Sequence, residues 1–213
     1  YGNGSYKIRG GATAEVIWQT KNDSNATITE HELISGITYD KTKEQIIFTA
    51  TGVEGNALVA LKDENGTILW SWHLWIVNET NEDLGVDLGN GVVFMDRNLG
   101  ALSKNPDGGY LTFGQQYQFG RKDPFQAGSH NGSESGYEGV YYNMYPHLAI
   151  NVFKEMSISL PESIASPNTI SKDGNSWITP LTEPSWGWNK NNKSLWDPCP
   201  VGWMIADFEN NMR

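Results

Sequence analysis

The segment at residues 70–77 reads WSWHLWIV and limits the fold more than any other part of the sequence. Successive side chains of a β-strand point to opposite faces of the sheet. The two faces would carry Trp70, Trp72, Leu74 and Ile76 on one side, and Ser71, His73, Trp75 and Val77 on the other. Both sets are mostly apolar, which predicts a core strand covered on both faces. His73 is then a buried or half-buried residue that needs a hydrogen-bond partner, not a metal or substrate ligand.

The preceding residues predict a hairpin that pairs this strand. Asn65-Gly66 lies between the apolar run at 57–61 and the strand, and both residues tolerate a positive φ angle. Residues 46–51 are rich in β-branched and aromatic side chains, as strands are. Together these patterns predict a β-sandwich segment.

Residues 14–19 also predict a strand of this segment, because apolar and polar side chains alternate there. Ala14, Val16 and Trp18 would share one face. Glu15 and Gln19 would then point to the other face.

A short acidic stretch at residues 78–83 predicts a domain boundary. The proposed division is a β-sandwich segment at 1–80 and a loop-rich α+β domain at 81–213. The fold class is therefore mainly β. We expect the first part to be incomplete at its N-terminus and the second at its C-terminus.

Three further elements are predicted in the second part. A hairpin is expected from 86–88 and 92–95, around Gly89-Asn-Gly91. One short helix is expected at 113–119, followed by Gly120 in the position that favours glycine after a helix. Another is expected at 146–155, where apolar residues recur with helical spacing.

The overall charge excludes some partners. The chain has 15 basic and 25 acidic residues, a net charge of −10, and its longest basic run is Arg121-Lys122. Such a surface repels nucleic acid and anionic lipid. No apolar run approaches the roughly 18 residues of a membrane-spanning helix.

The sequence contains few signals of catalysis. The four histidines lack a metal-binding spacing, and no phosphate-binding glycine loop is present. The single cysteine, Cys199, lies between two prolines and is expected to be a buried small side chain. The turn acids Asp63, Asp107 and Asp173 could bind calcium but match no calcium motif, so solvated turn acids are expected and no cofactor is predicted.

Aromatic side chains are the remaining candidates for binding. The nine tryptophans are expected mainly in the core, but Trp186 and Trp188 lie in the polar, glycine-containing stretch PSWGWN, which is typical of an exposed loop. Indole rings contact sugar rings and protein partners alike. The candidate ligand-binding residues are Trp186, Trp188, Trp177, Tyr141 and Tyr142.

Four motifs occur in a fixed order along the chain. They are WSWHLWIV at 70–77, MDRNLGA at 95–101, QYQFGRKDPF at 116–125 and WDPCPVGW at 196–203. In this order they resemble fimbrillin-like surface proteins of Bacteroidetes that carry a Fibrobacter succinogenes major paralogous domain. The resemblance implies an exported protein, commonly a lipoprotein, on the outer-membrane surface or in a fimbria. It also implies a second domain similar to C-type lectins, and it brings no catalytic residues.

The motifs also have simple structural interpretations. Asp96 and Arg97 could pair with each other or bind the loop backbone, with a turn at 98–100. The prolines next to Asp123 and Cys199 would fix turns.

Three functions remain open at this stage. The first is a non-enzymatic adhesion protein or pilus component whose partners are other fimbrial subunits. The second is a module that binds host or dietary glycans through exposed tryptophans. The third is a glycan-active hydrolase, whose two carboxylates could come from distant strands.

Overall fold

The computed structural model describes residues 8–21, 33–79, 84–89, 91–112, 114–125, 152–154, 156–171, 178 and 193–206. The elements are β1 (Thr13–Lys21), β2 (Ile34–Asp40), β3 (Gln45–Ala50), β4 (Gly55–Lys62), β5 (Ile68–Ile76), β6 (Gly85–Asp87), β7 (Val93–Met95), η2 (Pro106–Thr112), β8 (Val152–Lys154), α2 (Leu160–Ala165) and β9 (Thr169–Ser171). The fold is mainly β, as predicted, and most of its strand pairs are antiparallel. No helix in these ranges is long and apolar enough to cross a membrane.

A three-stranded antiparallel sheet with the order β1-β4-β5 forms the centre of the molecule. The predicted β4–β5 hairpin is confirmed, and β4 is buried along almost its whole length. In the connecting turn, Asp63 Oδ1 accepts hydrogen bonds from the backbone N–H groups of Asn65 and Thr67. Only Gly66 adopts a positive φ, of 84°. The turn is therefore closed by an aspartate and a single glycine.

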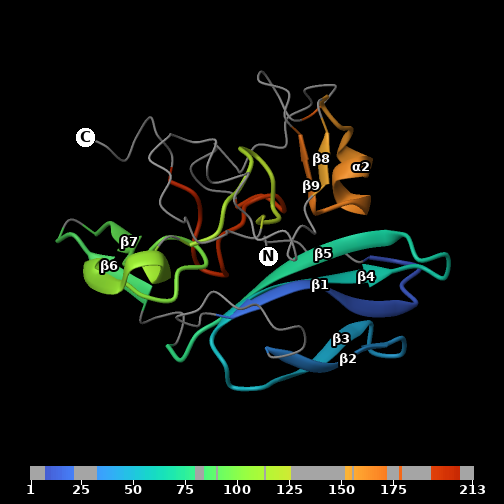
Figure 1. Ribbon diagram of the computed structural model, residues 1–213, viewed down its shortest axis with the longest axis horizontal. Coiled ribbons are helices and arrows are strands. Elements are labelled where there is room, and N and C mark those ends of the chain that lie inside the picture. Colours follow the sequence, from blue (N-terminus) through green and yellow to red (C-terminus); the bar gives the residue numbers. More distant parts are fainter. Residues whose placement is uncertain are drawn as a thin grey trace.

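The β2–β3 hairpin covers one face of this sheet, and α2, β8 and β9 lie on the opposite side (Figure 1). Leu33 and Ile34 at the start of the hairpin are buried against Ala57 and Val59 of β4. The partly buried side chains packed on this cluster are Val16, Ile37, Trp72, Leu74 and Ile76. Since alternate residues of β5 reach this cluster, its predicted alternation is confirmed at positions 72, 74 and 76.

A β-bulge in β1 makes the predicted faces of Trp18 and Gln19 wrong. The register with β4 shifts between Val16 and Trp18, so Trp18 lies opposite Leu58 and close to His73. Gln19 instead turns to the β2 side, where its Oε1 accepts from the N–H groups of Leu33 and Ile34. The extra residue at the bulge reverses the alternation beyond it.

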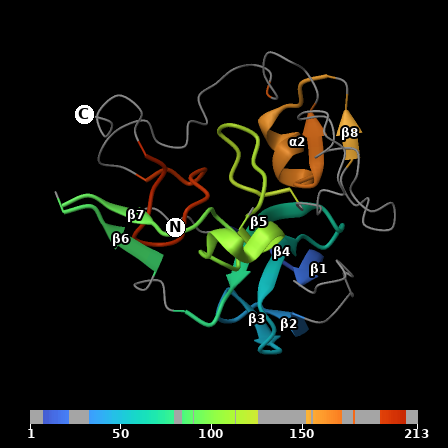
Figure 2. The same cartoon turned by 60° about the vertical axis from the view of Figure 1, so that its left-hand side comes forward.

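The second part of the chain agrees with only some of the predictions. The β6–β7 hairpin is confirmed, and it projects away from the central sheet (Figure 2). The helix predicted at 113–119 is wrong: residues 114–119 are not helical, and Gln116 forms an antiparallel bridge with Phe125. Gly120 nevertheless has the positive φ expected of it, 81°.

The helix predicted at 146–155 is also wrong where the structure describes it, because residues 152–154 form β8, which pairs in parallel with β9. The short helix α2 was not predicted. Ser159 and Glu162 form a capping box at its start, with Pro161 in the first turn. A Ser-x-x-Glu pattern was therefore present in the sequence as a signal for this helix.

Candidate functional site

The four sequence motifs meet around β5. Trp75 Nε1 donates to the Ala101 carbonyl oxygen over 3.1 Å, which joins the first motif to the second. Ser71 Oγ donates to Asp123 Oδ2 over 2.9 Å, which joins the first motif to the third. The ring of Trp70 meets that of Trp196 edge to face, with centroids 5.6 Å apart, which adds the fourth. Residues far apart in the chain thus form one contact region.

His73 occupies the middle of this region. Asn56 Nδ2 donates to the Gly100 carbonyl oxygen, so Asn56 Oδ1 is left to accept a hydrogen bond from His73 Nε2–H at 2.9 Å. His73 Nδ1 then accepts from the Tyr117 hydroxyl at 3.2 Å. Burial lowers the pKa of His73 to about 4, against a smaller opposing effect of Asp123. His73 is thus a half-buried, hydrogen-bonded histidine, as the sequence predicted, and its lowered pKa favours the neutral form.

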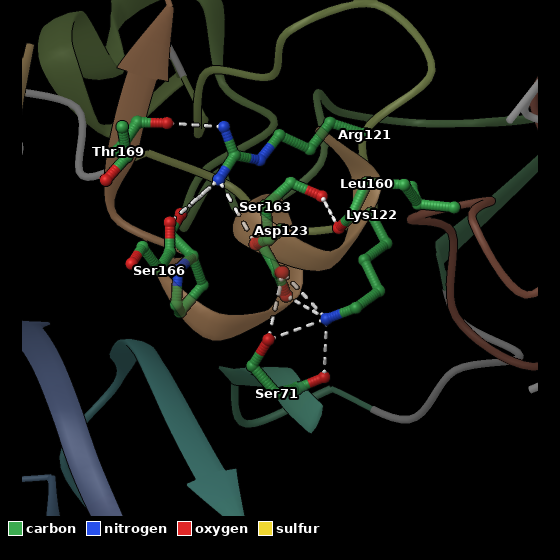
Figure 3. A network of polar contacts seen from close by, with 9 residues as sticks. Ser71, Arg121, Lys122, Asp123, Leu160, Ser163, Ser166 and Thr169 are labelled. Carbon is green, nitrogen blue, oxygen red and sulfur yellow. Dashed lines mark hydrogen bonds and ion pairs between the residues drawn. The ribbon is translucent and has the colours of Figure 1, made fainter. Parts of the chain in front are cut away.

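Next to His73, a buried ion pair attaches the third motif to β5 (Figure 3). Lys122 Nζ lies 2.7 Å from both carboxylate oxygens of Asp123 and 2.6 Å from Ser71 Oγ. It also donates to the Ser71 carbonyl oxygen and lies 4.4 Å from the Trp70 ring centroid. Burial lowers the pKa of Lys122, and the Asp123 carboxylate opposes that shift. The ammonium is surrounded by partners, so its role is to hold the two segments together.

Arg121 extends this attachment to the α2 region (Figure 3). Its guanidinium donates to the backbone carbonyl oxygens of Ser163, Ser166, Pro167 and Thr169. Burial lowers the pKa of Arg121 to about 10. These bonds satisfy carbonyl groups at the end of α2 and in the turn that follows, which lack helical partners.

Arg121 and Lys122 form the longest basic run of the sequence and belong to the third motif, and the structure shows that both are buried. A signal for this was available. The triplet Arg-Lys-Asp stands directly before Pro124, among aromatic residues. Charged side chains can be buried when an oppositely charged neighbour pairs with them, and Asp123 is such a neighbour.

A groove of about 440 Å³ lies beside the edge of the central sheet. Among the described residues, β5 pairs only with β4, so its other side forms that edge. The groove is lined by Phe48, His73, Leu74, Trp75, Ile76, Val77, Glu79, Leu84, Leu99, Pro198, Pro200 and Val201. The lining therefore combines β5 with Phe48 of β3 and with residues of the second and fourth motifs.

The groove has the chemistry of a surface that binds an apolar chain. Its one carboxylate, Glu79, forms an ion pair with Arg97 at 2.6 Å. Arg97 also pairs with Asp96, at 2.7 Å, which is one of the two arrangements that the sequence left open, and this contact lowers the pKa of Asp96. The predicted turn at 98–100 is confirmed by the hydrogen bond from the Ala101 N–H to the Asn98 carbonyl. The acidic side of the groove is thus neutralised by a fixed ion-pair network.

The surroundings of Cys199 disfavour a thiolate. Its side chain is buried, as predicted, and burial raises the pKa of its thiol to about 12. In the part of the chain that the structure describes, no three His, Cys, Asp or Glu side chains are grouped as metal ligands.

The candidate residues predicted from aromatic content stay untested by the structure. Trp186, Trp188, Trp177, Tyr141 and Tyr142 all lie outside the described residues, as does Asp173. The other turn acids have structural partners: Asp63 binds its own turn, and the backbone N–H of Asp107 binds Asn105.

Comparison with known proteins finds no matching family model, no similar curated protein and no similar solved structure.

Proposed function

We propose that this chain is a non-enzymatic protein of the outer-membrane surface, an adhesion protein or fimbrial component, and that it binds another subunit in the groove beside β5. The observation that carries the proposal is the position of the groove. It lies beside a sheet edge, and Phe48, Leu99 and Val201 line it together with β5. An incoming strand could pair with β5 and insert alternate side chains into the groove.

The arrangement of the four motifs supports this proposal. Residues 73–77, Leu99, Pro198, Pro200 and Val201 belong to three of the four motifs and all line the groove. The third motif binds the adjacent part of β5 through Asp123 and Lys122. The motifs that carry the fimbrillin-like resemblance thus build a binding wall, which suits an assembly or adhesion role. In this proposal the first part of the chain is a β-sandwich and the second a lectin-like domain.

A synthetic peptide tests strand addition directly. The probe is an extended peptide of about eight residues in which valine alternates with threonine, long enough to pair along β5. We expect it to slow hydrogen exchange at those backbone amides of residues 73–77 that do not already pair with β4. Phe48→Glu, at a half-exposed position of the lining, should abolish the effect by placing a charge in the apolar groove.

Met156→Glu is the matched control, because Met156 is 66% exposed and does not line the groove. Equal binding to the protein and to the Phe48→Glu variant would rule out the groove as the acceptor.

Surface location is tested separately, by antibody labelling of intact producing cells. Labelling only after lysis would contradict the proposed location.

The glycan-binding alternative rests on Trp186 and Trp188, for which the sequence predicts an exposed loop. Flat indole faces suit sugar rings. Glycan-array binding that is lost in Trp186→Ala and Trp188→Ala would favour this alternative. A folded protein that binds no glycan on the array would count against it.

A further inference from the structure

The amine of Lys193 lies at the centre of a group of three oxygen atoms. Lys193 Nζ is 2.9 Å from Asp197 Oδ1, 2.6 Å from the Cys199 carbonyl oxygen and 2.9 Å from the Trp203 carbonyl oxygen. We call these three oxygens and the amine the lysine cage. An ammonium group has three N–H donors, so each oxygen can receive one. The loop at 193–205 is thereby closed around a single positive charge.

The carboxylate of the lysine cage is held in place by the loop backbone. Asp197 Oδ1 also accepts from the Cys199 N–H at 2.8 Å, and Asp197 Oδ2 accepts from the Ile205 N–H at 3.0 Å. The Asp197 side chain is fully buried, whereas that of Lys193 is 15% exposed. Without the ammonium, a buried carboxylate and two inward-facing carbonyl groups would face one another with no cation between them, which is unfavourable.

We propose that Lys193 is a built-in cation that closes the loop at 193–205 and thereby positions the Pro198–Val201 wall of the groove. One carboxylate and backbone carbonyls are the oxygen ligands with which hard metal ions organise loops. Here an amine of the chain itself supplies the charge. The carbonyl of Cys199 belongs to the lysine cage, and its neighbours Pro198 and Pro200 line the groove. Only the consequence for partner binding rests on the function proposed above.

The single cysteine of the chain reports directly on whether this loop is closed. Cys199 is buried, and its raised thiol pKa keeps the thiolate form scarce, so a small disulfide reagent such as 5,5′-dithiobis(2-nitrobenzoate) should react slowly. In Lys193→Met, we expect the labelling rate to rise by roughly tenfold or more, because charge-assisted hydrogen bonds that close the loop are lost. Circular dichroism on the same samples separates local opening from global unfolding.

Lys154→Met is the matched control. Lys154 also pairs with a carboxylate, Glu162 Oε1 at 3.3 Å, but its side chain is 42% exposed and far from the loop in sequence. We expect this variant to label at the rate of the unsubstituted protein. Lys193→Arg keeps the positive charge but not the compact ammonium, so it should label faster than the unsubstituted protein.

Chemical rescue distinguishes a built-in cation from a side chain that only fills space. Lys193→Ala removes three carbons and the amine, and n-propylammonium supplies those same groups. We expect n-propylammonium to slow labelling of Lys193→Ala, and tetramethylammonium at equal ionic strength, which lacks N–H donors, to have no effect. A chelator or added calcium should leave the labelling of the unsubstituted protein unchanged.

Two results would overturn the inference: labelling of Lys193→Met at the control rate, or equal rescue by the two ammonium salts. These readouts involve no binding partner, so they are independent of the peptide experiment. If labelling behaves as expected while the peptide fails to bind, the lysine cage stands and the proposed strand-binding function fails.

Discussion

The hydroxyl of Tyr117 lies 3.2 Å from Nδ1 of His73, and this contact joins the central sheet to the loop that crosses it. Because Nε2 of the same ring binds Asn56, both ring nitrogens are used in the neutral form. Protonation of Nδ1 would place a second donor against the hydroxyl and a positive charge on a half-buried ring. The protonation state of His73 is therefore linked to the stability of the fold.

Stability should fall with acidification because of His73. Its pKa is lowered from 6.5 to about 4 in the folded chain, so the unfolded chain takes up the proton first as the pH falls. This contribution is complete above the unfolded pKa and is lost as the pH falls towards about 4, by roughly 3 kcal/mol. Urea unfolding across this window measures the slope. His73→Asn should flatten it, and an unchanged slope in that variant would contradict the assignment.

Trp72→Ala should strongly destabilise the chain. Trp72 packs on the cluster formed by Leu33, Ile34, Ala57 and Val59. Removing a large aromatic side chain from a packed interior costs about 3–5 kcal/mol, measured by chemical denaturation. Leu88→Ala is the control, since Leu88 is 60% exposed and its loss should change stability by less than about 0.5 kcal/mol. A Trp72→Ala variant that keeps its melting temperature would overturn this account.

The buried pair of Lys122 and Asp123 should show strong coupling. Lys122→Met leaves the Asp123 carboxylate buried without its ammonium partner, which should cost about 3–5 kcal/mol. Asp123→Leu should be damaging for the converse reason. The double variant should lose less stability than the sum of the single losses, by about 1–3 kcal/mol in a double-mutant cycle. Additive losses would show that the two charges stabilise the fold separately.

Gly100 should tolerate substitution far less well than Gly66, although both have a positive φ. A Cβ at Gly100 would lie 2.5 Å from Gln115 Cγ and 2.9 Å from Asn56 Oδ1, whereas one at Gly66 would meet nothing within 4 Å. Gly66→Ala should therefore cost about 1 kcal/mol for backbone strain alone. Gly100→Ala adds a clash beside the bond between Asn56 and His73, so thermal unfolding should show the larger loss. Equal losses would mean that the packing around Gly100 relaxes freely.

Local patterns predicted the strands and hairpins well, because strand alternation and turn glycines depend on neighbouring residues. They failed where one residue changes the register. The bulge between Val16 and Trp18 reverses the faces of Trp18 and Gln19, and nothing in the alternation of β1 indicates it. The pattern at residues 114–119 predicted a helix, but these residues are not helical. Tertiary hydrogen bonds, such as that of Tyr117 with His73, outweigh their weak local preference for a helix.

The groove could not be predicted, because it depends on which strand forms the sheet edge. The sequence indicated that both faces of β5 are covered, and it contained no information on the order β1-β4-β5. The burial of Arg121 and Lys122 depends in the same way on carbonyl groups and side chains more than 40 residues away. The predictions for Trp186 and Trp188 remain predictions.

The meeting of all four motifs at β5 has a consequence for synthesis of the protein on the ribosome. Trp196, which packs on Trp70, follows the end of β5 at Ile76 by 120 residues. At about 5–20 residues per second, roughly 6–24 s pass before it is made. During this interval the newly made chain has an apolar sheet surface without its final cover. Ribosome-bound chains stalled before Trp196 should therefore recruit chaperones that the finished chain does not bind.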